Sequence, residues 1–212
     1  MADRDSLEAT SRDLYNEVVV NTGGWASTAK MHILNTALRC MEADEQYLEI
    51  GSYVGRSLVG ALLDNDKSAQ VIDPFELFLP DGNTIHKAWT KAITDFGVAD
   101  RVNLHKTLCA DFNSGLPPIG VYYYDGDHDS GHTYEGLKKF EQYLTDSALI
   151  IVDDYLIFGG NAQTPYPGHS VDVETPVKTD TDRWVAETKE AELVCILPWE
   201  DQSAVIRYER NR

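Results

Sequence analysis

The stretch Leu48-Glu-Ile-Gly-Ser-Tyr-Val-Gly-Arg-Ser-Leu58 decides the fold of this 212-residue chain. Its apolar start predicts a short strand and its end predicts a helix, with Gly51 and Gly55 in the turn between them. Glycines in such a turn let the backbone approach a ligand closely. The turn lacks the closely spaced first glycine pair of the GxGxxG fingerprint, which disfavours a pyrophosphate ligand.

Strands and helices alternate along the rest of the chain. The predicted strands are Tyr47–Ile50, Ala69–Asp73, Val102–His105, Gly120–Asp125, Ala148–Asp153, Leu193–Leu197 and Ala204–Tyr208. The predicted helices are Leu7–Val20, Thr28–Met41, Arg56–Leu63, Ile85–Phe96, Tyr134–Leu144 and Asp182–Glu190. This order predicts an α/β fold with a mainly parallel seven-stranded sheet, helices on both faces and a C-terminal antiparallel hairpin. We expect residues 1–45 to form a helical segment of the same domain as residues 46–212.

Composition excludes several classes of protein. The net charge of −17 disfavours binding to nucleic acid or to anionic membranes. No apolar run approaches the ~20 residues of a membrane span, and the polar N-terminus is unlike a secretory signal, so we expect a cytoplasmic protein. Three cysteines without a CxxC pair argue against a disulfide scaffold. Cys40 and Cys195 lie in apolar surroundings and are expected in the core.

Acidic residues near the turn favour a particular cofactor. S-adenosylmethionine has no phosphate and carries a positive sulfonium, which suits Glu49 ahead of Gly51. Asp73, at the end of the second strand, is placed to accept hydrogen bonds from both ribose hydroxyls. Cys109 and Ala110 follow the third strand, where an adenine ring would lie. The alternatives are a plain strand-to-helix turn and an ordinary Asp-Pro turn.

Three carboxylates are expected to converge at one end of the sheet. The fourth strand leads into Asp125-Gly-Asp-His128, and the fifth leads into Asp153 and Asp154. Crowded carboxylates repel one another unless a cation neutralises them, and oxygen ligands suit Mg²⁺, Mn²⁺ or Ca²⁺. Such an ion would lower the pKa of a substrate hydroxyl, and His128 would accept the proton.

Two alternative roles for these aspartates stay open. Asp125, Asp127 and Asp129 resemble the start of an EF-hand loop, but Ser130 and Gly136 stand where that loop needs glycine and glutamate. Strand-end aspartates can also simply cap turns and helices.

Two motifs of the sequence resemble those of a known family. Residues 48–58 are similar to the first motif of class I S-adenosylmethionine-dependent methyltransferases, above all the cation-dependent catechol and caffeoyl-CoA O-methyltransferases. Tyr124-Asp-Gly-Asp-His128 with Tyr134-Glu-Gly136 resembles the DGDHxYEG signature of bacterial macrolide and aminocoumarin sugar O-methyltransferases. The resemblance runs from about Gln46 to Tyr155, and the closing hairpin extends it to the Rossmann-like methyltransferase fold.

The resemblance implies a set of site residues. Cofactor contacts are implied or expected at Glu49, Gly51, Ser52, Tyr53, Gly55, Ser57, Asp73, Cys109, Ala110 and Asp125. Metal ligands are implied at Asp125, Asp153 and Asp154, and the catalytic pair is His128 with Asp125. Residues 129–132 look inserted relative to the signature, so His132 stays open as the alternative base.

The expected function is S-adenosylmethionine-dependent, divalent-metal-dependent O-methylation of a small-molecule hydroxyl. The alternatives are a metal-free methyltransferase acting on nitrogen or carbon, a metal-dependent hydrolase, and a non-catalytic nucleotide-binding module. A homo-oligomer stays open. The long loop Leu156–Glu174, with its glycines and aromatic residues, is expected to close over the acceptor.

Overall fold

The computed structural model describes residues 4–76, 83–156, 175–197 and 202–210, with side chains from residue 13 onward. Its strands are β1 (Gln46–Ile50), β2 (Ala69–Ile72), β3 (Val102–His105), β4 (Ile119–Tyr124), β5 (Leu144–Val152), β6 (Ala191–Ile196) and β7 (Ala204–Glu209). Its α-helices are α1 (Arg4–Asn21), α2 (Thr28–Arg39), α3 (Arg56–Leu62), α4 (Asn83–Asp95), α5 (His132–Phe140) and α6 (Pro176–Glu187).

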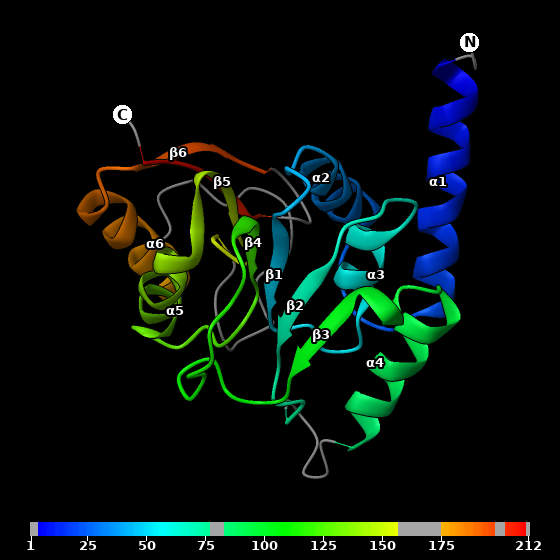
Figure 1. The fold of residues 1–212 in the computed structure, drawn as a ribbon, viewed down its shortest axis with the longest axis horizontal. Coiled ribbons are helices and arrows are strands. Elements are labelled where there is room, and N and C mark those ends of the chain that lie inside the picture. Colours follow the sequence, from blue (N-terminus) through cyan, green and yellow to red (C-terminus); the bar gives the residue numbers. More distant parts are fainter. Residues whose placement is uncertain (1–3, 77–82, 157–174, 198–201, 211–212) are drawn as a thin grey trace.

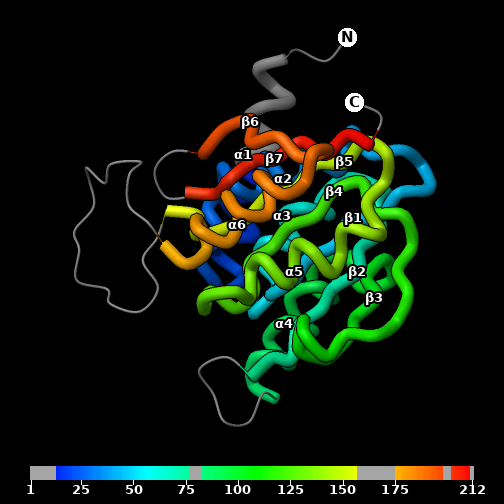
Figure 2. The backbone as a smooth tube through the Cα atoms, turned by 90° about the vertical axis from the view of Figure 1, so that its left-hand side faces the viewer, coloured from blue at the N-terminus to red at the C-terminus, as the bar shows by residue number. Residues whose placement is uncertain are grey.

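The strands form one seven-stranded sheet in the order β3-β2-β1-β4-β5-β7-β6. Neighbouring strands from β3 to β5 run parallel, whereas β7 is antiparallel to both β5 and β6. Figure 2 shows this order from β6 and β7 at the top to β3 at the bottom. The predicted Rossmann-like arrangement with a closing antiparallel pair is confirmed.

Helices cover both faces of the sheet and create two hydrophobic cores. Helices α1–α4 pack on the face that carries Tyr47, Val71 and Tyr123. Helices α5 and α6 pack on the opposite face, against Leu48 and Tyr122 (Figure 1). The alternation of β1 and β4 side chains between the two cores follows from the two-residue period of a strand. Among the residues that the structure describes, no helix has the length and apolar character to cross a membrane.

The register of the parallel strands aligns their carboxyl ends. Ile50 pairs with Ile72 on one side and with Tyr124 on the other, and Tyr124 pairs with Val152. The backbone ladder continues for one more residue, because the N–H groups of Gly51, Asp125 and Asp153 donate to Ile72, Ile50 and Tyr124. The residues that follow the four central strand ends therefore form a row along one edge of the sheet.

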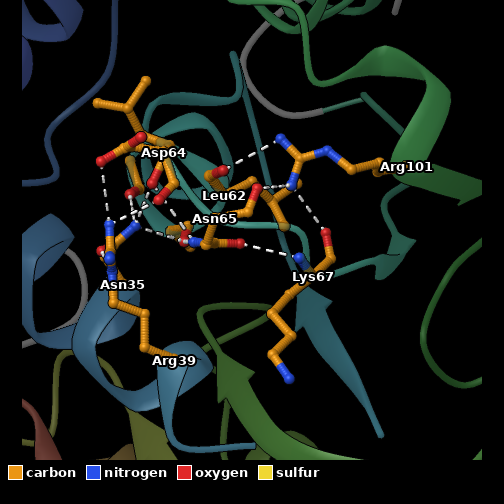
Figure 3. Close-up of polar contacts among 10 residues, drawn as sticks. Asn35, Arg39, Leu62, Asp64, Asn65, Lys67 and Arg101 are labelled. Atoms are coloured by element: carbon orange, nitrogen blue, oxygen red, sulfur yellow. Dashed lines mark hydrogen bonds and ion pairs between the residues drawn. The ribbon is translucent and has the colours of Figure 1, made fainter. Parts of the chain in front are cut away.

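A polar network holds the C-terminal end of α3 against its neighbours (Figure 3). The buried Asn35 amide on α2 donates to the carbonyls of Gly60, Ala61 and Leu63, at 3.3, 3.0 and 2.6 Å. From the other side, the Arg101 guanidinium donates to carbonyls of Leu62, Asn65 and Lys67. These bonds satisfy the last helix carbonyls, which have no partner within the helix. The Asn35 bonds fix α2 against the end of α3.

Several predicted boundaries were wrong. The fifth strand begins at Leu144, four residues before the predicted start, because the polar residues Thr145–Ser147, of which Asp146 and Ser147 are exposed, hid its first half. The fifth α-helix accordingly ends at Phe140. The last helix begins at Pro176 instead of Asp182, with Thr175 as its N-cap and proline in the first turn, where its missing N–H costs nothing.

The prediction that Cys40 and Cys195 lie in the core was also wrong, since both are exposed. Cys40 follows the last turn of α2, beyond its buried stripe. Cys195 lies on β6, an edge strand that alternates between half-buried and exposed positions over most of its length.

The Asn35 network predicts a loss of stability on truncation. Asn35→Ala should lower the free energy of unfolding by about 1–3 kcal/mol, because buried carbonyls at the end of α3 lose their donor. Chemical denaturation measures this change. Asn113→Ala, at an exposed position, is the matched control and should be nearly neutral. Equal stability of the two variants would contradict the capping role.

Candidate functional site

The turn after β1 and the acidic segment after β4 are in direct contact. Gly51 has a φ of +79°, and a Cβ atom built on it would lie 1.9 Å from the carbonyl oxygen of Asp125. No residue with a side chain fits at that distance without moving the backbone. The predicted cofactor turn and the predicted acidic cluster are therefore two parts of one site.

The Asp73 carboxylate organises the turn from the neighbouring strand. Its Oδ2 accepts the backbone N–H groups of Ser52 and Tyr53 at 2.7 and 2.8 Å, and its Oδ1 accepts that of Phe75 at 2.6 Å. Burial raises the pKa of Asp73, and these three donors oppose that rise. Three of the roughly four acceptor positions of the carboxylate are thus used inside the protein.

Aromatic side chains surround the same turn. The Trp89 indole N–H donates to the Ser52 hydroxyl at 3.0 Å, and Gly55 packs against the Trp89 ring. Tyr53 has a φ of +50°, and its ring stacks parallel to that of Trp25, with centroids 5.1 Å apart. Trp25 belongs to the connection between α1 and α2 and is 75% exposed. The N-terminal segment therefore borders the turn.

Glu49 is a completely buried carboxyl group beneath the turn. It accepts hydrogen bonds from the Tyr47 hydroxyl at 2.7 Å and from the Ser57 hydroxyl at 2.9 Å. Burial raises the pKa of Glu49 to about 7, although these hydroxyl donors lower it in part. An acid with that pKa exists in both protonation states near neutrality, so a nearby positive charge would favour its ionised form.

Asp153 already has a cation within the chain. The Lys30 ammonium, on α2, lies 2.6 Å from both carboxylate oxygens of Asp153. The Tyr123 and Ser203 hydroxyls donate to the same carboxylate at 2.6 and 2.7 Å. Burial would raise the pKa of Asp153, but Lys30 together with the two hydroxyl donors outweighs that effect, so the pKa is lowered. The expected repulsion among three carboxylates is thus relieved at one of them by a residue of the chain.

The other two carboxylates flank His128. Its Nδ1 lies 3.3 Å from Asp154, and its Nε2 lies 3.6 Å from Asp125, beyond hydrogen-bond length. Nε2 is buried and makes no hydrogen bond to any residue within the described ranges. Burial alone would lower the pKa of His128, but the two carboxylates raise it above its usual value. Ligand-capable atoms of the three residues lie within 4.8 Å of one another.

Asp125 and Asp154 remain short of positive charge. Burial and the neighbouring Asp153 raise the pKa of Asp125 to about 7, and the same two causes raise that of Asp154. Asp154 also has a φ of +52°, a left-handed conformation that aspartate tolerates better than most residues.

His132, the alternative base, lies apart from this group. It begins α5, its side chain is 47% exposed, and its Nδ1 pairs with Asp127 at 2.7 Å. The geometry therefore brings His128, and not His132, between the two carboxylates next to the turn.

The remaining predicted residues occupy the ends of β1, α3 and β3. Ser57 is buried in the first turn of α3 and faces Glu49. Cys109 and Ala110 follow β3, and the Lys139 ammonium binds both of their carbonyl oxygens. The predicted acceptor loop falls almost wholly on residues 157–174, outside the described residues.

The sequence patterns did not identify Lys30, Tyr123 and Ser203 as residues of the site. A signal for Lys30 existed, because it shares the i, i+4, i+8 stripe of α2 with Leu34 and Leu38, both buried. A lysine on an apolar stripe indicates a buried partner. Ser203 had no such signal, since only the β5–β7 pairing brings it to Asp153.

A family comparison covers both the turn and the acidic cluster. A family model described as a methyltransferase domain matches residues 48–155, which span the turn and the acidic cluster. The chain belongs to this methyltransferase family. The predicted resemblance is thereby confirmed at the level of the family. No curated protein matches the methyltransferase at a significant level.

Solved structures share the fold of this methyltransferase at low sequence identity. An O-methyltransferase from Bacillus cereus in complex with SAH has a TM-score of 0.67 and 14% identity, with 94% of this chain and 90% of that chain covered. The O-methyltransferase TomG from Streptomyces achromogenes, involved in tomaymycin synthesis and in complex with SAM, has a TM-score of 0.62 and 16% identity. There, 95% of this chain and 88% of that chain are covered.

The raised pKa of Glu49 predicts a specific pH dependence of stability. The pKa is about 7 in the folded protein against an ordinary 4.5, so the fold loses stability as Glu49 ionises between those two values. Glu49→Gln removes this loss. The free energy of unfolding of the variant, relative to the wild type, should therefore rise on the order of 3 kcal/mol from pH 4.5 to pH 7.

Denaturant titrations at several pH values measure this difference, and comparison with the wild type cancels the contributions of Asp125 and Asp154. Parallel stability curves for the two proteins would show that Glu49 ionises as freely in the folded state as in the unfolded chain.

Proposed function

We propose that this methyltransferase is an S-adenosylmethionine-dependent O-methyltransferase that acts on a hydroxyl of a small molecule. The observation that carries the proposal is the contact of Gly51 with Asp125. It joins a turn suited to the methyl donor to a group of residues suited to removing a proton. Transfer to oxygen requires both functions at one place.

The turn and its acidic neighbours fit the donor. S-adenosylmethionine supplies a methyl group on a positively charged sulfur, and it also carries an ammonium group. Glu49 offers a carboxyl group that a positive charge would ionise, and the Gly51–Gly55 turn offers its backbone. Asp73 holds the Ser52 and Tyr53 amides in place and keeps about one acceptor position for a ribose hydroxyl. Cys109 and Ala110 would border the adenine.

His128 fits the role of proton acceptor. Its Nε2 is buried without a hydrogen bond to a described residue. This nitrogen is therefore available to accept a proton from a substrate hydroxyl. Asp154 next to Nδ1 and Asp125 near Nε2 stabilise the imidazolium that forms when His128 takes the hydroxyl proton. Asp125 thereby supports catalysis as well as bordering the donor turn.

The oxygen atoms of the acidic residues also suit a divalent cation. Asp125 and Asp154 offer oxygen ligands, and burial together with the neighbouring Asp153 raises the pKa of both carboxyl groups. They would hold Mg²⁺, Mn²⁺ or Ca²⁺ beside His128, and the ion would lower the pKa of a substrate hydroxyl. Asp153 would join them only by giving up its contact with Lys30.

The Lys30–Asp153 ion pair favours a second candidate, a metal-free methyltransferase. Lys30 supplies one positive charge to the cluster without any ion. Methyl transfer that persists in EDTA would select this candidate, and loss of transfer in EDTA with recovery in Mg²⁺ would select the metal-dependent one.

The net charge of the chain favours a small molecule as the methyl acceptor. The net charge of −17 opposes the approach of nucleic acid and of anionic lipid surfaces. Transfer of a labelled methyl group to a panel of phenols and sugars, with RNA as the contrasting acceptor, tests this class.

The most economical test of the whole proposal is thermal unfolding with separate additions of S-adenosylhomocysteine, NAD and Mg²⁺. A ligand that binds the folded state raises the midpoint temperature. The proposal predicts a rise with S-adenosylhomocysteine and none with NAD. The reverse result would favour a nucleotide-binding module.

Asp73→Ala should weaken the binding of S-adenosylhomocysteine at least about tenfold, because the turn loses a charged acceptor worth ~1.5–3 kcal/mol per bond. Isothermal calorimetry well below the unfolding temperature measures the affinity. Asp95→Ala, which removes an exposed carboxylate on α4, is the matched control and should bind normally. Wild-type affinity in Asp73→Ala would remove Asp73 from the donor site.

His128→Asn should lower kcat by about a hundredfold to ten-thousandfold, the usual contribution of a general base, while S-adenosylhomocysteine affinity stays nearly unchanged. His132→Asn is the control at the alternative position. The opposite pattern, with activity lost only in His132→Asn, would transfer the role of base to His132.

A further inference from the structure

Lys30 is a buried charged residue that has no role in binding the methyl donor or in removing the proton. It is 6% exposed and lies on α2, which is far in sequence from the acidic segments. Its ammonium contacts both oxygens of Asp153 symmetrically, at 2.6 Å each. Electrostatic attraction to Asp125 and Asp154 adds to that of Asp153. Lys30 therefore faces the same carboxylate group that a cation would face.

The contacts of Asp153 leave no room for a metal ion. A carboxylate has about four acceptor positions on its two oxygens. Lys30 takes one on each oxygen, Tyr123 takes a second on Oδ2, and Ser203 takes a second on Oδ1. Asp125 and Asp154, by contrast, receive no lysine or arginine contact from the described residues.

We propose that Lys30 is an internal counter-ion that withholds Asp153 from metal coordination. A divalent cation is then held by Asp125 and Asp154 beside His128, without the third carboxylate. This inference rests on the metal-dependent form of the proposed function. Because fewer charged ligands mean weaker binding, Lys30 also weakens the affinity of the site for the ion. Lys30 is thus a positioning residue that sets the metal requirement from the N-terminal helical segment.

The test is the affinity for Mn²⁺, measured by calorimetry and by the loss of the free-ion electron paramagnetic resonance signal. Lys30→Met frees Asp153 while keeping a long apolar side chain on the α2 stripe. This variant should bind Mn²⁺ about tenfold tighter than the wild type or better, in the range that residues behind the ligands control. Lys91→Met, which breaks an exposed ion pair on α4, is the matched control and should leave the affinity unchanged.

The double variant Lys30→Met/Asp153→Asn protects the test against misfolding. It removes both charges together, so no buried charge is left unpaired. If Lys30 withholds Asp153, the double variant binds Mn²⁺ as the wild type does. This measurement decides the question even where Lys30→Met alone does not fold.

Three results would overturn the inference. Equal Mn²⁺ affinity of Lys30→Met and the wild type would show that Lys30 does not compete with the ion. A double variant about tenfold weaker than the wild type would show that Asp153 is itself a ligand. Absence of Mn²⁺ binding in every variant would overturn it as well, together with the metal-dependent form of the function. Binding of S-adenosylhomocysteine, measured in the same samples, would show whether the methyl-donor assignment survives.

Discussion

The close approach of Gly51 to the Asp125 carbonyl is the constraint on which the site depends. It follows from the register of the parallel strands, which brings the residue after β1 next to the residue after β4. A glycine in the left-handed conformation is the residue that can turn away from the sheet at this distance. The turn that leads into α3 and the segment that carries His128 therefore begin from the same point.

Charge is distributed unevenly around that point. On one side, the Asp73 carboxylate accepts hydrogen bonds from backbone amides and so shapes the turn. On the other side, Asp125 and Asp154 stay short of positive charge and surround an imidazole. Lys30 brings a positive charge from α2 to Asp153, so the N-terminal helices are electrostatically part of the site. The hydrogen bonds of Asn35 to the end of α3 hold the same helix in place.

The sequence allowed prediction of what depends on local patterns. Strand ends followed by glycine or aspartate marked Gly51, Asp73, Asp125 and Asp153, and the parallel register then brought them into one row as expected. What could not be predicted depends on partners distant in the chain. A lysine 123 positions before Asp153 becomes its counter-ion only through the packing of α2 on the sheet. Asp73 was expected to face a ligand, but no sequence pattern revealed that three backbone amides donate hydrogen bonds to its carboxylate.

We infer that the Gly51–Gly55 turn and the residues around His128 form a single site. Titration of the ¹⁵N-labelled methyltransferase with S-adenosylhomocysteine, followed by amide chemical shifts, tests it directly. If the two segments form one site, the amides of Ser52 and Tyr53 and those of Asp125–His128 shift together, with one common dissociation constant. Shifts confined to one of these segments, or centred on the far edge of the sheet at β6, would contradict it.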